Sequence, residues 1–310
     1  MDVVSEVLRM SGVRGSLGAQ IEAGGRWAMA LDDFPGAALH VAITGRARVT
    51  VPGREPVELA AGDVVLLGAG LEHRLSDSAD EYGAPTAEFE VPEPGRVIRL
   101  GTPPVRTRLV TIFYDCDHTA RTQVLPTLPD LLHIPGGDGT EGVGDIVRLL
   151  TRELAHPRFA GTAVLDGLVD IMLIQLLRAW LPGRPGDQRG TWLGMLTDPI
   201  VHRALQHLHA DPAHPWTTAK LAATLAVSRA TLARRFPAAI GQSPVAYLTQ
   251  WRMDLAAARL RSGSGSVEAV AASVGYLSVP AFSRAFTRAH GQAPGRFRSA
   301  PAESVGTKPT

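Results

Sequence analysis

The last third of the chain contains two copies of one pattern, and this internal repeat constrains the fold more than any other sequence feature. Residues 221–244 (LAATLAVSRATLARRFPAAIGQSP) align with residues 270–294 (VAASVGYLSVPAFSRAFTRAHGQAP), which carry one extra residue in the turn. A helical solenoid with a basic surface is the alternative explanation, but two copies are too few for one. The paired anchors lie 49 or 50 positions apart and are Ala222 with Ala271, Leu232 with Phe282, Arg234 with Arg284, Phe236 with Phe286, Gly241 with Gly291, and Pro244 with Pro294.

Each copy has the parts of a helix-turn-helix unit. A small residue allows two helices to cross closely, a second small residue occupies the turn, and a serine follows that can cap the free N–H groups of the second helix. Two apolar residues four positions apart then face the core. These parts are Ala222, Ala226, Ser228, Leu232 and Phe236 in the first copy, and Ala271, Gly275, Ser278, Phe282 and Phe286 in the second. The repeat therefore predicts two helix-turn-helix units.

The outer face of each second helix is the candidate DNA-binding surface. A helix seated in the major groove presents this face to base edges and phosphates. We predict base contacts for Arg234 and Arg284, whereas Arg229, Arg235 and Arg288 fit phosphate contacts or solvated charges better. The full candidate set is Ser228, Arg229, Ala230, Ala233, Arg234 and Arg235 in the first unit, and Ser278, Pro280, Ser283, Arg284, Thr287 and Arg288 in the second.

The charge of the chain is divided unevenly. Residues 1–191 carry 18 Arg and no Lys against 25 Asp and Glu, a balance of −7, whereas residues 192–310 carry 13 Lys and Arg against 5 Asp and Glu, a balance of +8. A basic C-terminal part joined to an acidic N-terminal part indicates that only the C-terminal part binds a polyanion. Between the two copies, a predicted helix over residues 245–261 would span about 25 Å. This length suits one monomer that contacts two successive major-groove segments, about 34 Å apart.

The N-terminal part has a different periodicity. Residues 37–75 contain short apolar runs separated by Gly and Pro turns, and strand patterns continue over residues 96–100 and 108–114, as expected for an all-β barrel or sandwich. Two amphipathic helices are predicted at 143–154 and 164–181. Their apolar face, centred on Met172, fits either a cover over the barrel or a dimer seam. The predicted organisation is a β barrel over residues 1–137, a helical dimerisation segment over 138–182, a linker over 183–195 and an all-α DNA-binding domain over 196–300.

The region from Ile200 to Arg298 resembles the DNA-binding domain of AraC/XylS-type regulators. The matching motifs are SRATLARRF, GQSPVAYLTQWRMDLAAARL, VAASVGYLS, AFSRAF and GQAPGRFR. Two prolines depart from the pattern. Pro237 is expected to cost the first recognition helix one backbone hydrogen bond and to bend its second half. Pro280 falls in the first turn of the second recognition helix, where proline is tolerated.

The N-terminal segment resembles the cupin class of β barrels, and GDVVLLGAGLEH is similar to the second cupin motif. The first motif is poorly kept, since only His40 stands where two His and a Glu are expected. The segments SEVLRMSGVRG, CDH and LPTLPDLLHIPG, together with Trp27, resemble the sensor half of a large AraC-like subgroup. The barrel resemblance could bring together a zinc or copper ligand set of His40, His73, Cys116 and His118. The alternative is that the histidines are hydrogen-bonded structure and that Cys116 is a small buried side chain; His133 is expected to be structural.

We therefore expect a sequence-specific transcription regulator that binds double-stranded DNA. Its barrel would sense a small-molecule, metal or redox signal, its middle helices would form a homodimer, and RNA polymerase is a further candidate partner. The alternative function is a metal-dependent cupin enzyme with a helical appendage. Cys116 is the single cysteine, the N-terminus lacks a secretion-signal pattern, and no segment reads as a membrane span, so we expect a cytoplasmic protein.

Overall fold

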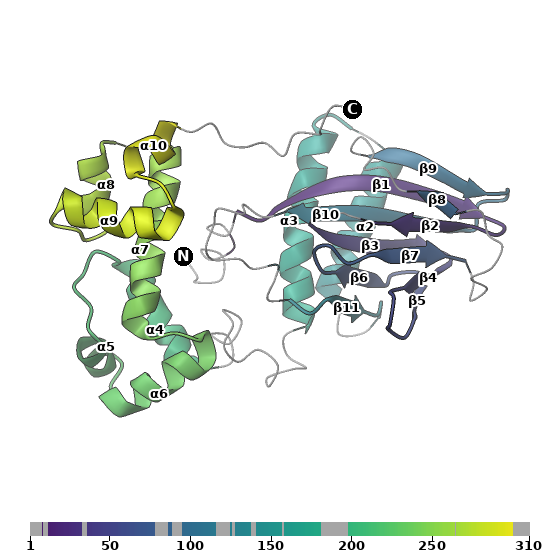
Figure 1. The fold of residues 1–310 in the computed structure, drawn as a ribbon. Helices are drawn as coiled ribbons and strands as arrows, with labels where there is room; N and C mark the ends of the chain where they lie inside the picture. The colour runs from purple at the N-terminus through teal and green to yellow at the C-terminus, as the bar shows by residue number, and fades with distance from the viewer. Residues whose placement is uncertain are drawn as a thin grey trace. The chain divides into compact units, whose positions relative to one another are not determined.

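The fold comprises two compact units (Figure 1). One unit contains Val13–Cys116 and Val124–Pro185, and the other contains the chain from Gly186 onward. The computed structural model describes residues 8, 12–32, 36–77, 86–88, 95–115, 125, 128–137, 141–156, 158–180, 198–263 and 265–299.

The first unit is built on two β-sheets. The six-stranded sheet has the order β11-β6-β3-β10-β1-β9, and the five-stranded sheet has the order β5-β4-β7-β2-β8. Neighbours are antiparallel except for the pairs β1–β9 and β2–β8, which are parallel. The strands are β1 (Arg14–Gly24), β2 (Ala28–Leu31), β3 (Ala37–Thr44), β4 (Arg46–Thr50), β5 (Val57–Ala60), β6 (Val64–Leu67), β7 (His73–Ser76), β8 (Thr86–Glu88), β9 (Arg96–Gly101), β10 (Thr107–Asp115) and β11 (Leu131–Ile134). This arrangement confirms the all-β prediction for the N-terminal part.

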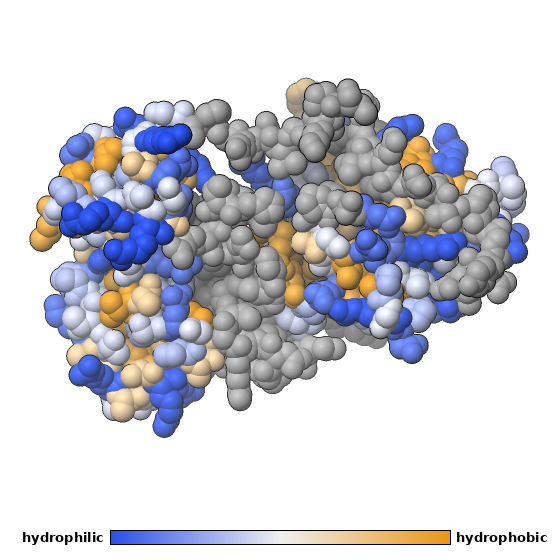
Figure 2. All heavy atoms as spheres, viewed as in Figure 1, coloured by the Kyte–Doolittle hydropathy of each residue, from blue (hydrophilic) through white to orange (hydrophobic). Residues whose placement is uncertain are grey.

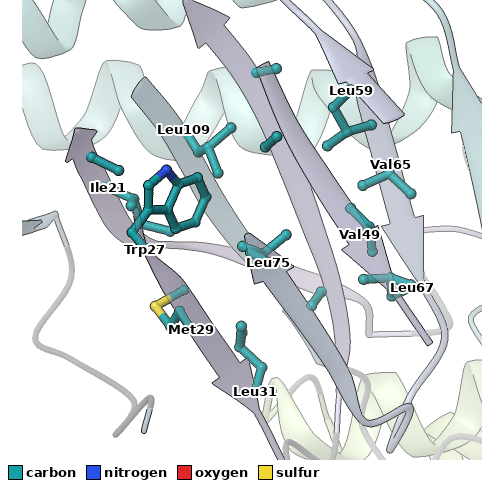
Figure 3. Packing of buried hydrophobic residues seen from close by; sticks show 14 of the residues in the cluster. Ile21, Trp27, Met29, Leu31, Val49, Leu59, Val65, Leu67, Leu75 and Leu109 are labelled. Atoms are coloured by element: carbon teal, nitrogen blue, oxygen red, sulfur yellow. The ribbon is translucent and has the colours of Figure 1, made fainter. Parts of the chain in front are cut away.

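Apolar side chains fill the space between the two sheets (Figure 3). Trp27 and Met29 extend into it from the five-stranded sheet side, and each is 1% exposed. Ile21 and Leu109 face them from β1 and β10, and both are buried. Burial of a large apolar side chain contributes about 1.5–3 kcal/mol. The interior of this unit is therefore a packed core.

Two helices cover one face of the six-stranded sheet: α2 (Glu141–Ala155) and α3 (Gly161–Trp180). The apolar side of α3, including the fully buried Met172, packs against α2, β1 and β11 of the same chain. The approach to β1 is close, because a Cβ added at Gly15 would lie 2.1 Å from Val169 Cγ1. The hydroxyl of Tyr114 also donates to the carbonyl oxygen of Val169 at 2.7 Å. The stripe that centres on Met172 is thus a cover over the sheet, the first of the two alternatives left open by the sequence.

The second unit is helical. Its elements are α4 (Pro199–Ala210), α5 (Thr218–Thr224), α6 (Arg229–Ile240), α7 (Pro244–Arg261), α8 (Val267–Ser273), α9 (Val279–His290) and α10 (Pro294–Ser299). The helix α7 joins the first group of helices to the last, as Figure 1 shows. Each of α4 to α9 begins after an Asp, Thr or Ser whose side chain accepts a hydrogen bond from the first turn. Such caps stabilise short helices, which would be only marginally stable as isolated peptides.

The two recognition helices each contain a proline, one in the first turn and one in the interior of the helix. Pro280 lies in the first turn of α9, as predicted. Pro237 lies inside α6, and the helix continues through it to Ile240, with Gly241 N–H donating to the Pro237 carbonyl at 2.8 Å.

Among the described residues, no helix is both long and apolar enough to cross a membrane.

Candidate nucleic-acid interface

The first helix-turn-helix unit consists of α5 and α6. Its turn contains Ala226 with φ of 55°, a left-handed conformation that a small residue tolerates best. The turn closes with a hydrogen bond from Val227 N–H to the Ala222 carbonyl at 3.0 Å. Ser228 then caps α6 by accepting from Thr231 N–H at 3.0 Å. Leu232 and Phe236 are fully buried, which leaves the opposite side of α6 free to face a ligand.

The second helix-turn-helix unit, α8 and α9, repeats this construction. Gly275 takes the left-handed turn position with φ of 84°, and Tyr276 N–H donates to the Ala271 carbonyl at 2.9 Å. Ser278 caps α9 through Ala281 N–H at 3.5 Å, and Phe282 and Phe286 are fully buried. Both predicted helix-turn-helix units are therefore present, with the small turn residues, serine caps and apolar anchors at the expected positions.

The two outer faces differ in chemistry. On α6, Ala230 and Ala233 are exposed beside Arg229 and Arg234, so the arginines rise from a small apolar surface. On α9, the exposed residues Pro280, Arg284, Thr287 and Arg288 are joined by the partly exposed Ser283. Four of these α9 residues form one open surface: Ser283, Arg284, Thr287 and Arg288. Figure 2 shows strongly hydrophilic residues gathered over α9.

The side chain of Arg235 is directed away from these exposed faces. Its Nε donates to Asp198 Oδ2 at 2.7 Å, and Asp198 also caps α4 by accepting from the N–H groups of Ile200 and Val201. Asp198 is itself largely buried, with 16% of its side chain exposed. The ion pair therefore connects α6 to the beginning of α4, and among the six candidates of the first unit Arg235 alone has this structural contact.

Two side chains outside the predicted interface hold the helical unit together from inside. His209 is buried against Trp251, with nearly parallel rings whose centroids lie 3.9 Å apart, and its Nε2 is 2.8 Å from the Tyr247 hydroxyl. Burial lowers the pKa of His209 to about 3, so the ring is neutral. Arg252 on α7 donates to backbone carbonyls of the α4–α5 turn. No local pattern in the sequence points to either contact, because the partners of His209 and Arg252 are 38 and 40 positions away.

Two of the four candidate metal ligands meet in the N-terminal β-sheet unit. His40 on β3 and His73 on β7 come from different sheets, and their Nε2 atoms are 2.8 Å apart. His73 Nδ1 lies 2.8 Å from the Leu71 carbonyl oxygen, and His40 Nδ1 lies 3.0 Å from Thr111 Oγ1. The other two candidates, Cys116 and His118, lie outside the described residues. Within the described part of the chain, no three His, Cys, Asp or Glu side chains gather as a metal site.

The hydrogen bonds of this pair fix the proton positions. Because a carbonyl only accepts, His73 Nδ1 donates to Leu71, and its Nε2 accepts from His40 Nε2–H. His40 Nδ1 then accepts from the hydroxyl of Thr111. Burial lowers the pKa of both histidines, and the neighbouring His73 lowers that of His40 further. Both rings are therefore neutral, which is also the form in which imidazole binds a metal.

His133 is structural, as the sequence analysis expected. Its Nε2 lies 3.0 Å from Asp63 Oδ2, and Asp63 also accepts from the N–H groups of Ala60 and Gly136. Asp63 lies just before β6, so these bonds connect the turn before β6 to the C-terminal end of its neighbour β11. The acidic side chain thus organises an edge of the sheet and is not available for a ligand.

Comparison with known proteins agrees with this architecture. A family model described as a cupin matches residues 2–182, and one described as a helix-turn-helix domain matches residues 221–300. An AraC-like transcription regulator of Streptomyces antibioticus is 40% identical over 306 residues, covering 97% of this chain and 99% of that protein. A similar regulator of Streptomyces lividans is 38% identical with the same coverage. The HTH-type transcriptional regulator AlkR of Acinetobacter baylyi is 28% identical and covers 96% of this chain and 99% of its own length.

All three relatives are named as regulators, which removes the alternative of a metal-dependent cupin enzyme. Their similarity extends over both units, and the helix-turn-helix match covers both recognition helices. The chain belongs to the AraC family of DNA-binding transcription regulators, with an N-terminal cupin domain and a C-terminal helix-turn-helix domain.

Proposed function

We propose that one chain places α6 and α9 in two successive major-groove segments of its operator, while the N-terminal unit senses an effector and forms a homodimer. The observation that carries the DNA-binding part is the equivalence of Arg234 and Arg284. Both are exposed on serine-capped recognition helices, two positions after a buried apolar anchor. Between the two helices, α7 contains 18 residues and is about 27 Å long at 1.5 Å per residue. This length is comparable to one DNA turn, about 34 Å.

Replacing Arg234 or Arg284 with Ala should weaken binding to the cognate duplex by about 1–3 kcal/mol, because a bidentate contact to a guanine would be lost. Each variant should lose discrimination at a few base pairs, and the two variants should affect different halves of the site. The measurement is a competition titration with a duplex selected in vitro by the full-length chain and with single base-pair substitutions of it. Arg148→Ala, an exposed arginine of α2, is the matched control. Equal weakening on every sequence would make both arginines phosphate contacts.

The homodimer is proposed to form through the outward side of α3. Val164 and Ile171 remain 44% and 42% exposed there, seven positions apart on one face of the helix. Exposed apolar positions at this spacing are typical of helix–helix contacts. The buried Met172 cannot serve this contact, because it packs on its own sheet.

Ile171→Asp should shift the full-length chain from dimer to monomer in analytical ultracentrifugation while its circular dichroism stays unchanged. A buried charge at an apolar contact is expected to weaken association by several kcal/mol. Asp170→Asn, on a neighbouring exposed position, is the control. A dimer of undiminished affinity in Ile171→Asp would place the contact elsewhere.

For the effector, we propose a zinc or copper ion held by His40 and His73 together with Cys116 and His118, which follow β10 directly. The support is the convergence of two buried imidazoles. His73 Nδ1 already donates to the Leu71 carbonyl, as the second ring nitrogen of a metal-bound histidine usually does. His40 would bind the metal through Nε2 in its other tautomer, in which Nδ1 carries the proton and donates to Thr111 Oγ1. Zinc sites use three or four protein ligands, so the pair needs at least one further residue. A metal needs no cavity, whereas an organic ligand between the sheets would have to displace packed side chains.

Protein purified without a histidine tag is expected to contain close to one equivalent of zinc or copper by elemental analysis, and His73→Ala should remove it. His133→Ala, a histidine of β11 outside the pair, is the control and should keep the metal. Less than about a tenth of an equivalent in the wild-type chain, before and after reconstitution, would exclude a metal site with the affinity of a structural zinc site. Cys116→Ser tests the coupling to DNA: unchanged regulation in cells would leave Cys116 without a sensory role.

A further inference from the structure

A single arginine connects the helix α7 to the beginning of the first helix-turn-helix unit. Arg252 Nε donates to the Pro212 carbonyl at 2.6 Å, and its Nη2 donates to the carbonyl oxygens of His214 at 2.9 Å and Ala213 at 3.4 Å. These three carbonyls belong to the turn between α4 and α5. One guanidinium thus satisfies three consecutive backbone acceptors, a geometry that its planar fork suits and that a lysine cannot reproduce.

The same turn contacts the second helix-turn-helix unit from the other side. A Cβ added at Gly275 would lie 2.6 Å from the Ala213 carbonyl oxygen and 2.8 Å from Ala213 Cα. Gly275 is the left-handed turn residue between α8 and α9, with φ of 84°. Residues 212–214, in the turn that leads into α5, therefore contact the turn that leads into α9. We call this contact the junction. The absence of a side chain at Gly275 is what lets the two turns meet.

The junction is stiff as well as close. Asp211 accepts from His214 N–H at 3.1 Å, and Trp216 Nε1 donates to the Asp211 carbonyl at 3.0 Å. Trp216 also packs on His214, with ring centroids 4.5 Å apart. Partial burial lowers the pKa of Arg252 from its usual value, although the guanidinium stays charged. A partly desolvated charge that is bonded to three carbonyls resists displacement, because breaking these bonds would leave it poorly solvated.

We propose that Arg252 is a positioning residue that fixes the rotational phase of α6 relative to α9 and so sets the operator spacing that the chain accepts. The proposal rests on the proposed function, in which both helices contact one duplex. Without the junction, the two units would be joined mainly through α7 and could adjust to different spacings. With it, inserting one base pair between the two contacted segments rotates one segment by about 35° relative to the other, and one helix is out of register.

The test compares two duplexes: the site selected in vitro by the full-length chain, and the same site with one base pair inserted between the two protected segments. The wild-type chain should lose roughly 10- to 100-fold in affinity on the inserted duplex, because one recognition helix forfeits its base contacts. Arg252→Met should reduce this ratio to about threefold or less, since a relaxed junction lets both helices regain their grooves. Using a ratio for one protein preparation removes any effect of a smaller active fraction.

Arg259→Met is the matched control. Arg259 is also on α7, but it bonds to Ser273 on α8, in the second helix-turn-helix unit. It should keep the wild-type ratio. Arg252→Lys keeps the charge but not the fork, is less disruptive should Arg252→Met fold poorly, and should give a reduced ratio too. If both Arg252 variants keep the wild-type ratio, the positioning role is wrong and the proposed function stands. If hydroxyl-radical footprinting of the wild-type complex protects only one groove segment per chain, the proposed function fails and the positioning role falls with it.

Discussion

Binding of the full-length chain to its selected duplex is expected to weaken about a thousandfold when the salt concentration rises from about 50 to 200 mM. Each phosphate that an arginine or lysine neutralises releases condensed counterions, so the logarithm of the affinity falls linearly with the logarithm of the salt concentration. The C-terminal residues 192–310 carry a balance of +8, against −7 for residues 1–191. A slope that corresponds to about six phosphate contacts gives the thousandfold change.

The cations that would provide this slope lie on and beside the recognition helices. The exposed arginines and lysine of the helical unit are Arg203, Lys220, Arg229, Arg234, Arg261, Arg284, Arg288, Arg296 and Arg298. Replacing one phosphate-contacting residue, such as Arg288, with Gln should reduce the slope by about one and weaken all sequences alike. Filter binding or fluorescence anisotropy over a salt series measures both effects. An affinity that stays flat over this range would contradict a phosphate-dominated interface.

The C-terminal domain could be predicted in detail because its signals are local. Serine caps, small turn residues and apolar anchors four positions apart all act within one helical turn, so Ser228, Gly275 and Phe282 could be assigned their roles from the sequence. The contact of Arg235 with Asp198 could not, because the partners are 37 positions apart in the sequence and no local pattern points from one to the other. The repeat shows only that Arg235 has no arginine counterpart in the second copy, where Ala285 takes its place. The close contact of Gly275 with Ala213 likewise joins residues that are far apart in the sequence, so no local pattern predicts it.

The N-terminal unit was less accessible to sequence analysis. The strands between residues 37 and 67 were predicted from alternation and tight turns. β1 was missed, because RGSLGAQIEAG mixes glycine with small and polar residues and shows no clear alternation, although the strand lies between β10 and β9 in the sheet. Its parallel partner β9 follows only after a long connection, which no local pattern encodes. Of the candidate metal ligands, the cupin resemblance correctly placed His40 beside His73, although they are 33 positions apart in the sequence.

Acid is expected to destabilise the DNA-binding unit through His209. Its pKa is about 3 in the folded unit, against 6.5 for an unperturbed histidine, because burial disfavours the charged ring. The unfolded chain therefore binds a proton below pH 6.5 that the folded chain does not. The resulting stability is fully present above pH 6.5 and is lost progressively as the pH falls towards 3, at about 1.36 kcal/mol per pH unit.

His209→Phe should separate this effect from other titrations. Phenylalanine keeps an aromatic ring against Trp251 but loses the hydrogen bond to Tyr247, so it should cost about 1 kcal/mol at pH 8. Between pH 6.5 and 5, the wild-type unit should lose about 2 kcal/mol more unfolding free energy than the variant, until the variant is the more stable of the two. Urea unfolding followed by tryptophan fluorescence measures this difference, with His202→Gln on the same helix as the control. Parallel pH profiles for the wild-type and His209→Phe chains would mean that His209 titrates normally in the folded state, and that the stacked, buried ring does not exclude the proton.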